Sequence, residues 1–538
     1  MRRLAVVPCA LAFVLAASAC APHRAPPERT LRLAFSERLN SLDPIYLSGA
    51  NGSAIDALAF SFLLRPRPDG TLVPDIALAE PTLGNGGIAR DGRTITYHLK
   101  RGVRWQDGAP LTSADVAFTI RALQNPRNTI GSRDPYDRIE RVETPDVATL
   151  RVRVRTPDAA IVGLLLTPDT NAAILPSHLL ARYASLDRVP FASMPLGSGP
   201  YRVTRWTRGA SVRFEADRDY FAGTPHLPAL ELRYVPDTTT TLVQLRTGEL
   251  DGVLGADPAL FARYRELPDA RVTNVPYTGA TALVFNVERA PLASRTMRRA
   301  LAMAVDAATL ARETYRGAVP ASDASRGLFS YADDPAAPWP RFDPAAASRA
   351  LDKLGWTRAS SGVRRKDGRD LELRTIFSNA SVANGTAAVL LQQQFARAGV
   401  RLVLQPFLAT QLYATAMDGG PLARGRFDVA LVAYSANVDP DETWLVACRE
   451  RAPQGFDWAR YCSADADAFS HEASRAFDRH RRITLVRALE RTVATDVPFL
   501  PLWRSREIDV LPRELAGFEP NGALPYASAS NWRFLPAH

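Results

Sequence analysis

The 538-residue sequence has little lysine, histidine and cysteine, and the first two shortages exclude whole classes of protein. A formal charge of +10 would suggest a nucleic-acid partner, but the only lysines are Lys100, Lys353 and Lys366, and the arginines are scattered. Codon bias explains this composition better than a phosphate-binding face, so no nucleic-acid partner is expected. The 7 histidines are scattered too, so we expect no metal site and no other cofactor.

The sequence also lacks the motifs of secreted hydrolases. It contains no Gly-x-Ser-x-Gly, Ser-x-x-Lys or His-Glu-x-x-His, and His471-Glu472 is followed by Arg475 where a second zinc ligand would stand. An enzyme of this class needs a nucleophile with its base, or a metal site. We therefore predict no catalytic residues and do not expect an enzyme.

The N-terminal apolar run is too short to cross a membrane. Arg2 and Arg3 precede apolar residues from Leu4 to Ala16, whereas a bilayer span needs about 20 residues, so this segment predicts a removable export signal. Its end, residues 17–20 (Ala-Ser-Ala-Cys), resembles the lipobox of bacterial lipoproteins, with Ala17 where that pattern usually has Leu. The resemblance implies that Cys20 carries lipid and becomes the N-terminus. Ordinary cleavage after Ala-x-Ala, with an incidental cysteine, stays open.

The sequence contains only four cysteines, and the export signal with its lipidation site accounts for two of them. Cys9 lies in the removed signal segment and Cys20 would carry lipid, which leaves Cys448 and Cys462 as an even pair in a compartment that permits disulfides. Closing a loop of roughly 15 residues would contribute about 3 kcal/mol in the chain-entropy model. A metal pair or a catalytic thiol is the alternative, but no Cys-x-x-Cys or histidine cluster supports either.

The length predicts two or three domains, because a single hydrophobic core stops growing near about 250–300 residues. Residues 21–30 include Pro22, Pro26 and Pro27 and predict an extended tether between lipid and fold. Alternating apolar residues predict the early strands. These strands are Leu31 to Phe35, Thr94 to Leu99 and Thr149 to Arg155.

Helix starts are visible between the strands. Thr112 and Asp115 form a capping-box pattern before an amphipathic helix, and Asp343-Pro344 predicts another helix that stops at Gly355. From residue 371 strands and helices alternate, which indicates α/β wrapping of a mostly parallel sheet. The expected elements there are the strand Leu371 to Phe377, the helix Ala387 to Ala398, the strands Val400 to Pro406 and Asp428 to Tyr434, and one long helix from about Ser470 to Thr495.

Segments spread over nearly the whole chain after residue 30 share one resemblance. They are Ser41 to Pro44, Gly70 to Ala77, Asp91 to Gly108 running into Leu111 to Val116, Gly197 to Tyr201, Tyr220 to Gly223, the helix from Thr238 into Gly248 to Asp251, Phe285-Asn286, and Arg295 to Asp306. In this order they resemble the bacterial extracellular solute-binding protein family 5, the peptide- and nickel-binding proteins of ATP-binding-cassette importers.

The resemblance implies an α/β, periplasmic-binding-protein-like class II fold with two lobes and a hinge. Domain I would comprise residues 31–60, 190–275 and 495–538, domain II residues 61–189, and domain III, the second lobe, residues 276–494. Pro498 to Trp503 would return to the first lobe.

The implied function is a monomeric, membrane-anchored lipoprotein on the extracytoplasmic face, which delivers peptides or peptide-like solutes to importer permeases and their ATPases. A transporter-independent chaperone or sensor is the alternative.

The resemblance also implies ligand-binding residues on both lobes. Backbone groups of Ser48, Gly49 and Ala50 would pair with an extended ligand, unless this is an ordinary surface loop. The opposite loop comprises Tyr434, Ser435, Ala436 and Asn437, followed by Asp439.

Two charge clamps of the peptide-binding relatives are missing from these positions. Relatives place an aspartate where Asn437 stands, so either the ligand lacks a free amine or Asp439 takes the role. The loop Ser378 to Ser381 also lacks the arginine that clamps a dipeptide carboxylate in relatives. We therefore expect a longer, end-blocked or neutral peptide-like ligand.

Overall fold

The computed structural model describes residues 29–536, except 37, 48, 68, 131–132, 169–171, 321–331, 380, 436–438 and 523. Within these residues ten strands form one mixed sheet in the order β16-β15-β17-β11-β18-β10-β1-β9-β8-β7. Their bounds, in that order, are Arg401–Phe407, Glu372–Ser378, Val429–Ser435, Ala270–Phe285, Phe499–Pro512, Gly252–Val253, Leu31–Phe35, Ala229–Tyr234, Ser211–Ala216 and Tyr201–Thr207.

The sheet is parallel at two places only. β1 pairs parallel with β9 and β10, and β15 pairs parallel with β16 and β17. The other pairs of this sheet are antiparallel. The expected parallel arrangement is therefore confirmed for residues 372–435, whereas the sheet as a whole is mixed because β11 and β18 run between the two parallel groups in opposite directions.

Smaller sheets and helices cover this frame. The small sheets are β4-β6-β5 (Thr94–His98, Thr149–Val154, Ile139–Asp146), β2-β3 (Leu64–Pro66, Leu72–Pro74), β12-β13-β14 (Thr357–Arg358, Arg364–Lys366, Arg369–Asp370) and β19-β20 (Leu515–Ala516, Arg533–Phe534). The α-helices are α1 Gly49–Ala59, α2 Ser113–Gln124, α3 Ile161–Leu164, α4 Ser177–Leu180, α5 Thr238–Thr247, α6 Phe261–Tyr264, α7 Arg295–Met303, α8 Ala307–Tyr315, α9 Pro344–Lys353, α10 Val382–Arg397, α11 Ala409–Leu412, α12 Thr443–Val446, α13 Ala464–Arg475 and α14 Arg479–Asp496.

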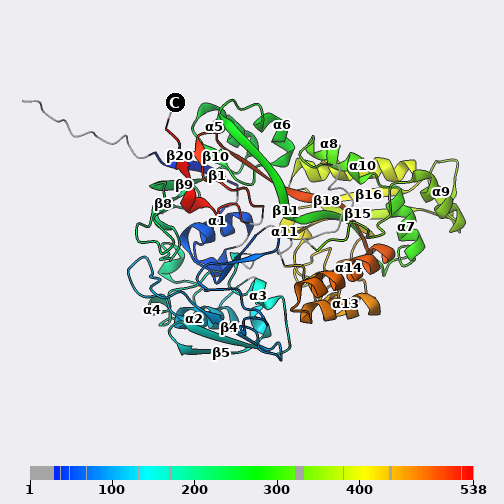
Figure 1. The fold of residues 1–538 in the computed structure, drawn as a ribbon. Helices are drawn as coiled ribbons and strands as arrows, with labels where there is room; N and C mark the ends of the chain where they lie inside the picture. The colour runs from blue at the N-terminus through cyan, green and yellow to red at the C-terminus, as the bar shows by residue number, and fades with distance from the viewer. Residues whose placement is uncertain are drawn as a thin grey trace, which may run out of the picture.

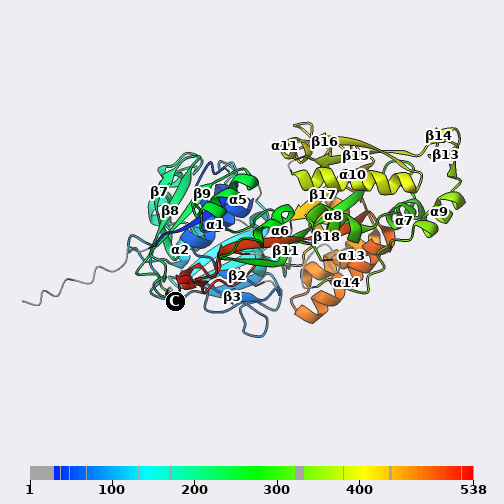
Figure 2. The same ribbon diagram turned by 90° about the horizontal axis from the view of Figure 1, so that it is seen from above.

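The chain divides into two lobes joined by β11 and β18 (Figure 1). The first lobe has a hydrophobic core that runs from Leu31 to Leu254 and takes in C-terminal residues from Leu511 to Trp532. The second lobe buries residues between Ala280 and Trp503 in two further clusters. Figure 2 shows the lobes from above, with the two long strands between them. The core of the first lobe is continuous across the expected domains I and II, whose boundaries stay a prediction.

Several helix predictions can be compared directly with the structure. Thr112 and Asp115 form the expected capping box of α2, and Asp343 caps α9 with Pro344 in its first turn. The single helix expected from Ser470 to Thr495 is wrong. Asp478 accepts a hydrogen bond from the backbone of Arg481 and starts a new helix, so the segment forms α13 and α14 instead.

The expected return of Pro498 to Trp503 to the first lobe is also wrong. Leu500, Leu502 and Trp503 pack in the second lobe, and Phe499 joins its other cluster. The return to the first lobe is made by the second half of β18, where Val510 pairs with Val253 of β10. The 14-residue strand is long enough to contribute to both lobes.

Candidate functional site

The two crossing strands lose their regular pairing where the lobes meet. Pro276 of β11 pairs with Arg506 of β18, and the next pair is Ala280 with Arg504, so three residues of β11 lie opposite one residue of β18. Gly279 has a φ of +150°, and a Cβ atom there would lie 2.5 Å from the carbonyl oxygen of Tyr434. This glycine lets the end of β17 approach the irregular segment closely.

The second lobe presents the carboxyl ends of three parallel strands at one edge. β15, β16 and β17 end at Ser378, Phe407 and Ser435. The chain leaves β15 for β16 on one side and then returns for β17 on the other, which makes a topological switch point beside β15. Open α/β sheets bind ligands at such points. The predicted segment from Tyr434 therefore begins at an edge suited to binding.

The side chain of Tyr434 points into the second lobe and serves packing. Tyr434 is 3% exposed, its ring stacks on Trp458 at 5.1 Å between centroids, and it meets Trp444 edge-on. Ser435, the next residue, is exposed. The predicted residues Ala436 and Asn437 lie outside the described residues. Any contact of Tyr434 with a ligand would have to use its backbone.

The predicted loop of the first lobe begins a helix. Ser48 lies outside the described residues, whereas Gly49 and Ala50 are the first residues of α1, which corrects the expected loop conformation. The first turn of a helix leaves N–H groups without partners inside the helix, so these residues can still donate hydrogen bonds. Their role in binding stays a prediction.

The Leu-Asp-Pro motif before this helix buries its carboxyl group. Asp43 is 0% exposed and accepts a hydrogen bond from the backbone N–H of Ile45 at 3.2 Å. Burial raises the pKa of Asp43 to about 7, although this hydrogen bond lowers it. Asp56, in the middle of α1, is also 0% exposed, and neither of its carboxyl oxygens has a hydrogen-bond partner among the described residues. The motif is thus a structural anchor beneath α1.

Asp439 is held by an arginine of its own lobe. Arg482 of α14 donates two hydrogen bonds to the Asp439 carboxylate, at 2.6 and 2.5 Å. Burial raises the pKa of Asp439, and Arg482 opposes that rise. The carboxylate therefore already has a cationic partner, which any ligand amine would have to share.

Charged groups of the two lobes meet across the junction. Arg138, at the end of a short 3-10 helix, donates to Asp158 at 2.9 Å and lies 3.6 Å from Asp441 of the second lobe. Burial would raise the pKa of Asp441, but Arg138, Thr443 and Arg482 together lower it. No sequence motif pointed to Arg138 or Asp158, because their partners lie far away in the chain.

Backbone contacts join the lobes beside these charges. The N–H of Ala159 donates to the carbonyl of Ser474 at 2.7 Å. Arg479 donates to the carbonyls of Asp69 and Gly70 at 2.7 and 3.0 Å. Phe477, between α13 and α14, packs against the core of the first lobe. The end of α13 and the start of α14 thus contact the first lobe, in addition to Asp441.

A cavity of about 610 Å³ lies between the lobes at this contact. The first lobe contributes Arg138, Arg155 and Asp158, and the second lobe contributes Asp441 and His471 among others. The volume falls within the range of small-molecule sites, about 300–1,000 Å³. The lining has charges of both signs, so the cavity can hold a polar solute.

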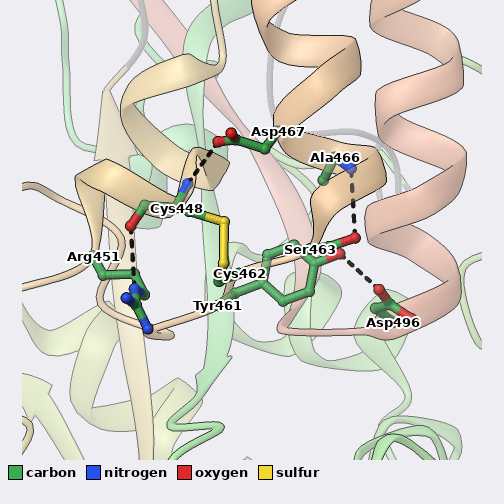
Figure 3. The surroundings of a disulfide bond; sticks show 8 residues. All are labelled: Cys448, Arg451, Tyr461, Cys462, Ser463, Ala466, Asp467 and Asp496. Atoms are coloured by element: carbon green, nitrogen blue, oxygen red, sulfur yellow. Dashed lines mark hydrogen bonds between the residues drawn. A yellow bond between two sulfur atoms is a disulfide. The ribbon is translucent and has the colours of Figure 1, made fainter.

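The predicted disulfide forms at the rim of this cavity. Cys448 and Cys462 are bonded, and Cys448 is one of the lining residues (Figure 3). Asp467 of α13 accepts a hydrogen bond from the Cys448 N–H at 2.9 Å, and Tyr461 donates to Asp496 at 2.7 Å. The disulfide therefore ties the loop after α12 to the start of α13.

The described residues contain neither a cluster of metal ligands nor a membrane-spanning helix. Within residues 29–536, gaps excepted, no group of three or more His, Cys, Asp or Glu side chains is placed to hold a metal ion. In the same residues no helix combines the length and apolar character needed to cross a membrane.

Comparisons with known proteins identify the family. The family model for bacterial extracellular solute-binding proteins, family 5 (middle region), matches residues 71–455. The oligopeptide-binding protein AppA of Bacillus subtilis (strain 168) is 23% identical over 492 residues, covering 88% of this chain and 86% of AppA. The glutathione-binding protein GsiB of Salmonella choleraesuis (strain SC-B67) is 26% identical over 441 residues, covering 80% of this chain and 81% of GsiB.

A solved structure shows the same fold. The crystal structure of NikZ from Campylobacter jejuni in complex with Ni(L-His) has a TM-score of 0.77 and 22% identity, covering 94% of this chain and 100% of NikZ. Both the two-lobed class II fold and the family expected from the sequence are thus confirmed. The chain belongs to family 5 of the bacterial extracellular solute-binding proteins.

Proposed function

We propose that this chain is the lipid-anchored substrate-binding component of an ATP-binding-cassette importer. It captures a peptide or peptide-like solute between its lobes and delivers it to the permease subunits. The observation that carries the proposal is the cavity of about 610 Å³, lined by both lobes and crossed by the contact of Arg138 with Asp441. A ligand held there would join the lobes through its own contacts, as a transport receptor requires.

The proposed ligand has an amino terminus that is uncharged, is chemically blocked or lies far from the binding residues. Asp439 already pairs with Arg482, and Asn437 stands where the family resemblance implies an aspartate. Gly49, Ala50 and Ser435 do not line the cavity, so their backbone groups would bind the ligand where it extends beyond the cavity, and backbone pairing is indifferent to ligand side chains. Exposed apolar side chains after the ends of β15 and β16 would cover the part of the ligand outside the cavity. They are Val382, Leu408, Tyr413 and Met417.

Calorimetry with a peptide and its N-acetylated twin tests the ligand class. The wild type should bind the two with similar affinity, because no free carboxylate is set aside for the amine. Asn437→Asp should favour the free-amine peptide by about 1–3 kcal/mol, the contribution of a charged hydrogen bond. A strong preference of the wild type for the free amine would contradict this ligand class. Mass spectrometry of solutes that co-purify from the native host would supply the peptide.

Membrane fractionation tests the proposed anchor. Cys20→Ser should move the protein from the membrane fraction to a soluble or unprocessed form, since a multi-chain lipid anchor binds membranes far more strongly than one acyl chain. Cys9→Ser, in the same signal segment, is the matched control, and this protein should stay in the membrane fraction like the wild type. Membrane retention of a Cys20→Ser protein whose signal has been cleaved would show that lipid on Cys20 is not the anchor.

A further inference from the structure

A second cavity, of about 340 Å³, lies within the first lobe at the carboxyl ends of its parallel strands. Phe35 ends β1, Val253 ends β10, and Val235 follows β9, and all three residues line the cavity. β1 lies between β9 and β10, so the connection from β9 through α5 to β10 crosses over it and creates a topological switch point. The cavity thus occupies a place where α/β sheets bind ligands.

Two acidic side chains of the crossing strand lie at this cavity. Glu507 and Asp509 are two residues apart on β18, so both project from the same face of the strand. Glu507 is 8% exposed and lines the cavity, whereas Asp509 is 0% exposed and accepts a hydrogen bond from Thr273 at 2.9 Å. Their carboxyl groups act electrostatically on each other, and Oδ1 of Asp509 has no hydrogen-bond partner among the described residues.

This acidic pair has no cationic partner. No arginine, lysine or histidine among the described residues forms an ion pair with Glu507 or Asp509. Buried carboxylates need either a cation or a proton. Burial and the neighbouring carboxyl raise the pKa of Glu507 well above its ordinary value, and burial raises that of Asp509 to about 6. A proton shared by the two groups therefore takes the place of the missing cation.

An independent observation comes from Tyr526, in the C-terminal segment. Tyr526 is 6% exposed and lines the cavity, and its hydroxyl is not among the fully enclosed polar atoms of the described residues, so it is open to the cavity. Such a hydroxyl can donate a hydrogen bond to a ligand or accept one from it. Glu507 and Asp509 act electrostatically on this hydroxyl, which places it on the side of the cavity that holds the acids.

The remaining walls suit a cation with an alkyl chain. Phe35 and Tyr264 line the cavity together with Tyr526, and aromatic rings beside a carboxylate attract ammonium groups. Leu254 and Ala256 supply apolar surface. Thr238 brings in the N-terminus of α5, whose partial positive charge would favour an anion, but an anion would lie against Glu507. The acidic pair therefore favours a ligand with a positive charge.

We infer that this cavity binds an alkylammonium group, which replaces the proton shared by Glu507 and Asp509. The ammonium keeps its charge on binding, and the carboxyl pair releases one proton to the solvent. The group would come either from a lysine side chain of a bound peptide or from a free small amine. The inference concerns this cavity alone and does not depend on the site proposed between the lobes.

Calorimetry with defined probes tests it. The free-amine probe is n-butylammonium chloride, and the peptide probes are Ala-Lys-Ala and Ala-norleucine-Ala, which differ only in the side-chain ammonium. At pH 7 we expect saturable binding of butylammonium, at least tenfold tighter binding of Ala-Lys-Ala than of Ala-norleucine-Ala, or both. The first result identifies a free amine as the source, the second a peptide side chain.

Variants connect binding with the acidic pair. Glu507→Gln keeps the size of the side chain and should weaken binding of the cationic probe at least tenfold. Glu519→Gln removes an exposed carboxylate nearby and should leave affinity unchanged. Tyr526→Phe removes only the hydroxyl and should weaken binding a fewfold, so it tests the site even if Glu507→Gln fails to fold.

Proton release gives a readout that a structural role would not change. Heats of binding in buffers of different ionisation enthalpy should show release of close to one proton at pH 7, and affinity should fall between pH 7 and pH 5. The titratable groups at the cavity are Glu507, Asp509, Asp257, Tyr264 and Tyr526. The inference is overturned if the wild type binds no butylammonium and does not distinguish the two peptides. Failure of both peptides to bind while butylammonium binds would identify a free amine as the source and would leave the proposed function, which concerns longer or end-blocked peptides, to its own tests.

Discussion

The two lobes hold their binding edges by different means. In the second lobe the edge is fixed by permanent charge and a covalent bond, through the pair Asp439–Arg482 and the disulfide Cys448–Cys462. In the first lobe Asp43, before α1, and Glu507, on β18, are buried and without a cationic partner among the described residues. The stability of two similar strand arrangements can therefore respond to pH in opposite ways. An ion pair stabilises the edge of the second lobe, whereas neutral acids stabilise that of the first.

The largest expected effect comes from breaking the ion pair of the second lobe. Arg482→Met leaves the buried Asp439 carboxylate without its partner and should lower the free energy of unfolding by about 3–5 kcal/mol. Urea unfolding measures the loss. Arg481→Met is the matched control, because Arg481 is adjacent but its side chain is 69% exposed, and its effect should stay within about 0.5 kcal/mol. Equal effects of the two variants would show that the pair does not fix this edge.

Removing the covalent bond should have a somewhat smaller effect. The double variant Cys448→Ser/Cys462→Ser opens a loop with a sequence separation of 14 and should lose about 3 kcal/mol, since the unfolded chain regains loop entropy. Reduction of the wild type should reproduce the loss. Alkylation of the unreduced, denatured protein should label neither Cys448 nor Cys462. Labelling of both cysteines would contradict the disulfide and the statement that a covalent bond stabilises the edge of the second lobe.

The smallest expected effect, measured over one pH unit, is a pH dependence located in the first lobe. The folded pKa of Asp43, about 7, lies above the unfolded value of 3.8, so the folded state binds more protons between these values. This contribution to stability is complete below pH 3.8 and is lost as the pH rises through 7, with a slope of up to about 1.4 kcal/mol per pH unit.

Asp43→Asn isolates this contribution, because the amide oxygen can still accept from Ile45. Urea unfolding between pH 4 and pH 8 should show a shallower decline for the variant than for the wild type. Asp465→Asn, at an exposed position of α13, should keep the wild-type slope. Identical slopes for all three proteins would show that the first lobe is not held by neutral Asp43.

Local patterns in the sequence predicted local structure well. The strand Leu31–Phe35 has the expected bounds, the capping box at Thr112 is formed, and the two cysteines pair. These features depend on residues close together in the chain or on elimination among very few candidates. The same reasoning wrongly predicted α13 and α14 as one helix, because the cap at Asp478 lies inside a continuous helical pattern.

Contacts between distant residues could not be predicted from the single sequence. Arg482 and Asp439 are 43 residues apart, and Arg138 is far from Asp441, so no spacing rule connects them. The run Glu507-Ile508-Asp509 has the alternation of a half-exposed strand, but both of its acids are buried because β18 crosses the interior. The family resemblance provided the fold, whereas the charges that shape each cavity emerged only with tertiary structure.

The course of β18 has a consequence for the newly made chain. This strand contributes Phe499 and Leu500 to the two cores of the second lobe, Val510 to a cluster beside α5, and Leu511 to the main core of the first lobe. A chain emerging from its N-terminus therefore cannot complete either lobe until its last forty or so residues are available, because long-range pairs form only when both partners exist. Until then β10 and β11 would expose unpaired edges, so the growing polypeptide depends on chaperones or on rapid completion to avoid aggregation.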